Sequence, residues 1–199
     1  MGYDRADSWT RRAKAAGFPA RSVFKLEEVD QRHRVVPSGG VAVDLGCYPG
    51  SWSKWLIGRK LRVVGVDLKA PELPGGTWIA ESVMDVEPDV LLAAIGGRAD
   101  LVVSDLAPNT TGQRLVDHVR QIALAERALT LARAVGKPGS AFVCKVFDGE
   151  DANGFVENVR GAYADVKRLK PDATRGTSVE FFVVAKGLRA EKPAAVEGS

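Results

Sequence analysis

The sequence predicts an α/β protein with one doubly wound, seven-stranded and mostly parallel sheet that ends in an antiparallel hairpin. Short apolar runs rich in β-branched residues alternate with segments of helical periodicity, which is typical of βαβ units whose helices cover both faces of a sheet. The last two apolar runs are separated by about nine residues that show no helical pattern. A hairpin at that point requires one of the two final strands to run antiparallel to the rest.

Each expected element follows from its local pattern. Seven runs have the length and composition of strands: 41–45, 62–66, 77–80, 101–104, 141–146, 165–169 and 179–185. Five segments have helical periodicity: 21–29, 51–57, 90–95, 115–135 and 153–163. Asp151 or Asn153 is the expected N-cap of the last helix. We expect one domain at 21–188, preceded by a basic N-terminal tail at 1–20 and followed by a flexible C-terminal tail at 189–199.

Composition excludes several classes of protein. The chain has 199 residues, 45% of them hydrophobic and 27% charged, as in one globular domain and unlike a fibrous or largely disordered chain. Cys47 and Cys144 have no second cysteine nearby, so neither fits a metal-binding or redox CxxC motif, and a reducing, cytoplasmic location is expected. No apolar stretch approaches the ~18 residues of a membrane span, and the polar start of the chain does not fit a signal peptide. We expect a monomer without a metal ion and without a membrane partner.

A glycine-rich turn follows the first expected strand. Gly46 and Gly50 allow the backbone to turn sharply and to approach a ligand closely after the acidic Asp44. The turn lacks the GxGxxG of a dinucleotide site, which favours a ligand whose charged amino-acid part, not a pyrophosphate, lies over it. Asp67, at the end of the second strand, is placed to bind ribose hydroxyls. Together these features indicate S-adenosylmethionine; the alternative is a structural βα turn with a solvent-facing Asp67.

Three charged residues are expected at the ligand-binding edge of the sheet. Asp105 follows the fourth strand, and Lys145 interrupts an apolar strand near its carboxyl end. Glu180 begins the final strand, and it reaches the same edge if that strand is antiparallel. Ion pairs at strand ends are the structural alternative. Methylation of a sugar hydroxyl needs a base or a stabilising cation at the oxygen, and a lysine freed of its proton by burial can supply the base.

The sequence resembles the FtsJ/RrmJ family of RNA ribose 2′-O-methyltransferases over about residues 21–187. The Lys-Asp-Lys-Glu tetrad of that family is matched by Lys25, Asp105, Lys145 and Glu180. The resemblance implies a Rossmann-like class I methyltransferase fold and S-adenosyl-L-methionine as cofactor. It also implies that Lys145 is the general base or key activator, that Asp105 orients it, and that Lys25 and Glu180 bind or position the target ribose.

The resemblance further implies a cofactor pocket. Its expected residues are Asp44, Gly46, Cys47, Tyr48, Pro49, Gly50, Trp52, Asp67, Ser82, Val83, Asp85 and Asp105. Cys47, Tyr48 and Ser51 stand where the family usually has alanines and a second glycine, so the pocket wall is bulkier. The family often has an aspartate for the adenine amino group; here Ser82, Asp85 or a backbone group could serve. Trp52 is either a ligand contact or a core residue.

Basic residues gather near both ends of a chain whose net charge is only +3. Such patches can follow a phosphate backbone, although charged runs are often only solvated surface. The expected RNA-binding residues are Arg11, Arg12, Arg21 and Arg175. His33 and His118 match nothing catalytic and are expected on the surface or in helices.

Several functions remain open at this stage. The leading interpretation is a 2′-O-methyltransferase of RNA, with rRNA of the large ribosomal subunit (23S rRNA) as the first substrate and tRNA as the alternative. A small-molecule methyltransferase would not explain Lys25, Lys145 or the basic clusters. An RNA-binding protein without catalysis would predict a broken tetrad.

Overall fold

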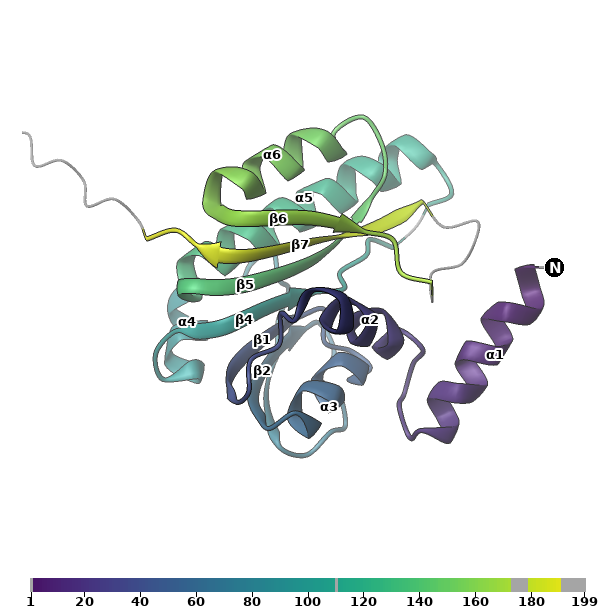
Figure 1. Ribbon diagram of the computed structural model, residues 1–199, viewed down its shortest axis with the longest axis horizontal. Helices are drawn as coiled ribbons and strands as arrows, with labels where there is room; N and C mark the ends of the chain where they lie inside the picture. The colour runs from purple at the N-terminus through teal and green to yellow at the C-terminus, as the bar shows by residue number, and fades with distance from the viewer. Residues whose placement is uncertain (1, 110, 173–178, 191–199) are drawn as a thin grey trace, which may run out of the picture.

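The computed structural model describes residues 2–109, 111–172 and 179–190 (Figure 1). Its strands are β1 (Gly40–Leu45), β2 (Leu61–Asp67), β3 (Gly76–Ala80), β4 (Ala99–Ser104), β5 (Gly136–Phe147), β6 (Tyr163–Leu169) and β7 (Glu180–Leu188). Its helices are α1 (Gly2–Ala15), α2 (Val23–His33), α3 (Ser51–Gly58), α4 (Pro88–Ile95), α5 (Arg114–Val135) and α6 (Ala152–Ala162). Asp151 is the N-cap residue of α6.

The seven strands form one sheet in the order β3-β2-β1-β4-β5-β7-β6. The pairs β1 with β2, β1 with β4, β2 with β3, and β4 with β5 are parallel. Strand β7 runs antiparallel to both β5 and β6. The predicted doubly wound sheet with a C-terminal antiparallel hairpin is therefore confirmed. The winding reverses between β1 and β4, and ligands of such sheets bind outside the carboxyl ends of the strands at this point.

Both faces of the sheet are covered by helices, and each face has its own apolar cluster. On β1, Val43 and Leu45 belong to the cluster shared with α4, α5 and α6, whereas Ala42 belongs to the cluster shared with α2 and α3. Figure 1 shows α5 and α6 on the upper and rear side of the sheet, with α2 and α3 on the opposite side. Burial on both faces explains why the central strands are continuous apolar runs.

The N-terminal segment differs from the expected basic tail. Residues 2–15 form helix α1, and Trp9 and Ala13, one turn apart, face α2. The rings of Trp9 and Phe24 lie 5.1 Å apart, and Ala13 is buried. The expected C-terminal tail at 191–199 lies outside the described residues. Over the part of the chain that is described, no helix combines the length and the hydropathy needed to cross a bilayer.

Asp30 fixes helix α2, which carries Lys25, against the rest of the domain. Its Oδ1 accepts a hydrogen bond from the backbone N of Val36 at 2.9 Å, at the exit of the helix. Its Oδ2 lies 2.6 Å from Nη2 of Arg59, which follows α3. One carboxylate thus joins the end of α2 to the end of α3.

Asp30→Ala is expected to lower the free energy of unfolding by about 2 to 3 kcal/mol, because it removes the ion pair and leaves the Val36 N–H without its acceptor. Asp172→Ala is the matched control. The Asp172 side chain is 83% exposed and 3.5 Å from Arg32, so its loss should change stability by less than about 0.5 kcal/mol. Urea unfolding followed by circular dichroism measures both, and equal effects would contradict the bracing role of Asp30.

Candidate active site

Lys145 and Asp105 form a buried pair at the carboxyl edge of the sheet. Asp105 is the first residue after β4, and its backbone N donates to Leu45 O of β1 at 3.3 Å. Lys145 is 7% exposed, and its Nζ lies 2.7 Å from the carbonyl oxygen of Asp105 and 2.9 Å from Oδ1. Burying an ammonium group without a partner costs free energy. The two oxygens of Asp105 offset this cost, and they allow a lysine within this buried strand.

Lys25 and Glu180 form a second buried ion pair at the same edge. Lys25 projects from α2, and Glu180 is the first residue of β7. On the antiparallel β5–β7 pair, Glu180 is opposite Phe147 and Phe182 is opposite Lys145. Residues two apart on a strand share a face, so Lys145 and Glu180 both project toward the α2 face. The antiparallel final strand, which the sequence predicted, therefore places Glu180 at the same edge of the sheet as Lys145.

Asp44 lies buried beside the glycine-rich turn. Its Oδ2 accepts a hydrogen bond from Ser53 Oγ at 2.6 Å, while Oδ1 is buried and has no hydrogen-bond partner among the described residues. Burial raises the pKa of Asp44 to about 7. A buried carboxylate oxygen that lacks a donor suits a cationic or hydrogen-bonding group brought by a ligand.

Gly46 gives the turn its shape. Its φ is +82°, and a Cβ at this position would come within 2.9 Å of Leu106, the residue after Asp105. A side chain is therefore excluded both by the backbone conformation and by the close approach of the β4 loop. The glycine turn and the loop that carries Asp105 are packed directly against each other.

Asp67 braces the turn from β2. Its Oδ2 accepts from the backbone N of Tyr48 at 3.0 Å, and its Oδ1 accepts from the backbone N of Lys69 at 3.3 Å. Tyr48 is 46% exposed, and Lys69 Nζ donates to its hydroxyl at 3.2 Å. Asp67 thus has the structural role that the sequence left open, while its half-buried carboxylate remains at the ligand edge.

The remaining expected cofactor residues divide into edge and core. Ser82 Oγ accepts from the backbone N of Met84 at 3.1 Å, and Asp85 and Pro49 are exposed. Val83 is buried in the core. Trp52 is 3% exposed, and its indole N donates to Ser22 O at 2.8 Å. Of the two roles left open for Trp52, these contacts favour core packing.

Both cysteines are buried thiols. Burial raises the pKa of Cys144 to about 12 and raises that of Cys47 above its usual range. Neither thiol is therefore a nucleophile near neutral pH. In the described part of the chain, no group of three or more His, Cys, Asp or Glu side chains could hold a metal ion.

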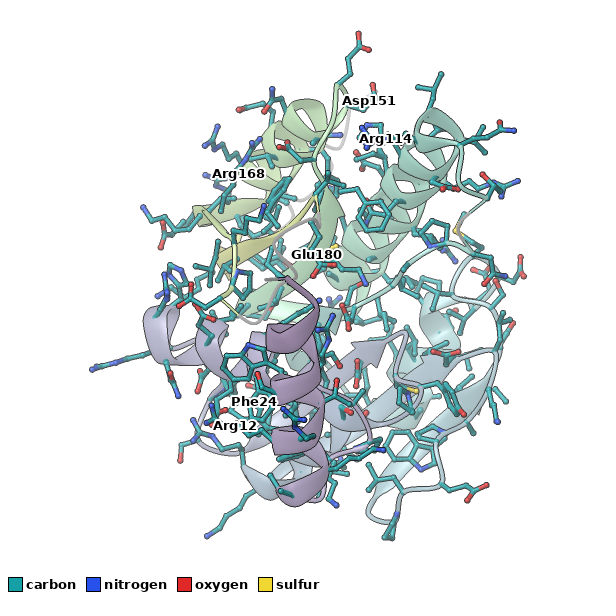
Figure 2. The ribbon with its side chains drawn as sticks, turned by 90° about the vertical axis from the view of Figure 1, so that its right-hand side faces the viewer. Arg12, Phe24, Arg114, Asp151, Arg168 and Glu180 are labelled. Carbon is teal, nitrogen blue, oxygen red and sulfur yellow. The ribbon has the colours of Figure 1, made fainter. Side chains whose placement is uncertain are left out.

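Two arginine side chains lie over aromatic rings near the buried pairs. The guanidinium of Arg12 lies 4.6 Å from the centre of the Phe24 ring, and that of Arg168 lies 4.9 Å from the centre of the Phe181 ring. Figure 2 shows Glu180 between Arg168 on one side and Arg12 with Phe24 on the other. Arg11 is exposed and Arg21 half-buried, while Arg175 lies outside the described residues.

Two buried polar residues of α5 were missed by the sequence analysis. Asp117 and Gln121 face the loop after Asp105 and the end of β5. The signal that could have found them is a polar residue at a core position of an amphipathic helix. His33 and His118 lie in α2 and α5, as expected, and His118 is buried.

The sequence of this chain is similar to those of known methyltransferases. Residues 18–188 match the sequence model of the FtsJ-like methyltransferases. A ribosomal RNA large subunit methyltransferase E from Desulfatibacillum aliphaticivorans is 44% identical over 89% of this chain and 88% of its own length. Its namesake from Myxococcus xanthus is 40% identical over 99% of this chain and 95% of its own length.

A solved structure shares the fold. A Plasmodium falciparum protein assigned as a ribosomal RNA methyltransferase superposes with a TM-score of 0.77, covering 86% of this chain and 98% of its own, at 23% identity. By the match of its sequence over most of its length, the chain belongs to the FtsJ-like methyltransferase family.

Proposed function

We propose that this protein transfers a methyl group from S-adenosyl-L-methionine to a ribose 2′-hydroxyl of RNA, with large-subunit rRNA as the substrate. The observation that carries the proposal is the pair of buried lysine–carboxylate contacts, Lys145 with Asp105 and Lys25 with Glu180, on one face of the ligand edge. The relatives named as large subunit rRNA methyltransferases support the choice of RNA. The proposal includes a cytoplasmic location and a monomeric state.

The residues at the switch point fit the methyl donor. When bound, S-adenosylmethionine supplies a methyl group on a positively charged sulfur. Asp44 Oδ1 would receive its ammonium group, because this buried oxygen lacks a donor among the described residues. Gly46 leaves the backbone open to close approach, and the carboxylate of Asp67 would accept from ribose hydroxyls. Ser82 and Asp85 lie after β3, where the adenine would be bound.

Lys145 is the group that activates the target hydroxyl. The 2′-oxygen exchanges its bond to hydrogen for a bond to the methyl carbon, which leaves the donor sulfur, so one proton must be taken up and the charge on the oxygen stabilised. The Nζ of Lys145, held by two oxygens of Asp105, would either accept that proton or donate to the oxygen while the proton passes to solvent. Asp105 orients Lys145, and the Lys25–Glu180 pair positions the ribose.

A methyl-transfer assay tests the proposal. The protein is incubated with S-adenosylmethionine carrying a radioactive methyl group and with large ribosomal subunits or bulk tRNA, both lacking 2′-O-methylation. Nuclease digestion then locates the label. Label on a ribose of large-subunit rRNA is expected; label on tRNA would keep the reaction and change the substrate. Absence of label from both RNAs, with the cofactor bound, would contradict the proposal.

Lys145→Ala is expected to abolish methyl transfer while S-adenosylmethionine affinity, measured by calorimetry, stays within about threefold, because Lys145 acts in the chemical step. Lys137→Ala is the control. Lys137 Nζ lies 2.5 Å from Oδ1 of Asp100, and neither residue belongs to the proposed active site. It should leave transfer unchanged. Equal losses of transfer and cofactor affinity in Lys145→Ala would contradict its role.

Cofactor binding is expected to strengthen from pH 5 to pH 7. Below its pKa of about 7, Asp44 holds a proton that must leave before its carboxylate can pair with an ammonium group. Affinity should therefore rise by up to about tenfold per pH unit, with proton release detected by calorimetry in buffers of different ionisation enthalpy. Asp44→Asn should bind weakly, with no such dependence. A wild-type affinity that is flat over this range would remove Asp44 from the ammonium site.

The double variant Arg11→Gln, Arg12→Gln is expected to weaken RNA binding and to reduce the slope of log affinity against log salt by about 1 to 2, because each arginine would neutralise one phosphate. We choose substitution because it keeps helix α1 in place. Truncation would also remove Trp9 and Ala13, which pack on α2. The double variant Arg133→Gln, Arg160→Gln, in the last turns of α5 and α6, is the charge-matched control. The slopes of log affinity against log salt are measured by filter binding. Equal slopes for all three proteins would show that Arg11 and Arg12 do not contact phosphates.

A further inference from the structure

The side-chain amide of Gln121 fills a gap in the sheet beside Lys145. Strand β4 ends at Ser104, whose partner on β5 is Cys144, but β5 continues to Phe147. The last backbone groups of β5 on that side therefore lie beyond the end of their neighbouring strand. Gln121 takes this place: its Nε2 donates to Lys145 O at 2.7 Å, and its Oε1 accepts from Phe147 N at 3.0 Å.

The side-chain amide of Gln121 makes the two hydrogen bonds that a residue of a neighbouring parallel strand would make. In a parallel ladder, one residue bonds the carbonyl of one neighbour and the N–H of the residue two positions on, and Gln121 bonds this same pair of groups. Gln121 is 1% exposed, and a buried amide is costly unless its groups are bonded. Both ends of the amide are bonded to β5, so side chain and strand satisfy each other.

Helix α5 also holds the loop that follows Asp105. Asp117, one turn before Gln121, accepts hydrogen bonds from Thr111 N at 2.7 Å, Thr111 Oγ1 at 2.9 Å and Gly112 N at 3.1 Å. The backbone of Thr111, as the main cause, lowers the pKa of Asp117, so these bonds persist at neutral pH. The first turns of α5 thus bind the loop beyond Asp105 on one side and the strand that carries Lys145 on the other.

We propose that Gln121 is a positioning residue that sets where the Nζ of Lys145 lies relative to Asp105. Asp105 binds the Nζ of Lys145, and Gln121 binds the backbone carbonyl of the same residue. Without the amide, the N–H of Phe147 loses its partner, the carbonyl of Lys145 keeps only the weak donor Cys144 Sγ at 3.4 Å, and the end of the strand can move. The link to catalysis rests on the proposed function, whereas the link between Gln121 and Lys145 does not.

The central variant is Gln121→Leu, which keeps the side-chain size and removes both hydrogen bonds. It is expected to slow single-turnover methyl transfer roughly 10- to 100-fold, as a displaced catalytic group does, with cofactor and RNA affinities within about threefold of wild type. Gln121→Asn, whose shorter amide cannot span both groups, is the milder second variant and should show a smaller loss in the same direction. Leu129→Ala, a core truncation on the same helix, controls for lost stability and should keep the wild-type single-turnover rate.

A second measurement does not depend on activity. Trace labelling of amines with acetic anhydride, quantified at Lys145 by mass spectrometry, reports how firmly its Nζ is held by Asp105. Labelling should rise in Gln121→Leu and in Gln121→Asn but not in Leu129→Ala. Unchanged labelling in both Gln121 variants would overturn the proposal, whatever happens to the rate, and so would a normal single-turnover rate in Gln121→Leu. If the wild-type protein methylates no RNA, the proposed function fails, and raised labelling at Lys145 still supports the role of Gln121.

Discussion

Two ammonium groups are buried at the carboxyl edge of the sheet, and the need to neutralise them governs how this edge is built. A buried charge without a partner costs on the order of several kcal/mol. Lys25 of α2 therefore meets Glu180 of β7, and Lys145 of β5 meets Asp105 beyond β4. Each pair joins segments that are distant in the sequence, so one helix and three strands must keep their relative positions to within the length of a hydrogen bond.

The reversed direction of β7, which the short hairpin connection requires, is what allows this constraint to be met. A parallel final strand would begin at the opposite edge, and Glu180 would lie far from Lys25. In the observed antiparallel register, Glu180 is opposite Phe147 at the very end of β5. Asp30 then holds α2 against the end of α3, and this contact keeps Lys25 over the first residue of β7.

The site has two halves that touch at the switch point of the sheet. The half that we propose for the cofactor consists of Asp44, the glycine turn and Asp67, at the ends of β1 and β2. The half that we propose for the methyl acceptor lies at the carboxyl ends of β4 and β5 and at the start of β7. They are joined where Gly46 packs on Leu106 and where Asp105 donates to Leu45. A larger residue at position 46 would push the turn away from Leu106 and the loop that carries Asp105, and the positive φ also favours glycine there.

Most of the fold and the four tetrad residues could be predicted from the sequence, because apolar runs, helical periodicity and the hairpin spacing are local signals, and the tetrad follows a family pattern. The helical form of residues 2–15 was not predicted, since its narrow apolar stripe has meaning only against Phe24 of α2. The core role of Trp52 depends on Ser22 lying within reach of its indole N–H. The sequence by itself determined which residues are the candidates for the chemistry. Only the tertiary structure decided how they are held, because β4 stopping before β5, and Gln121 filling the gap, depend on distances between elements that no local pattern encodes.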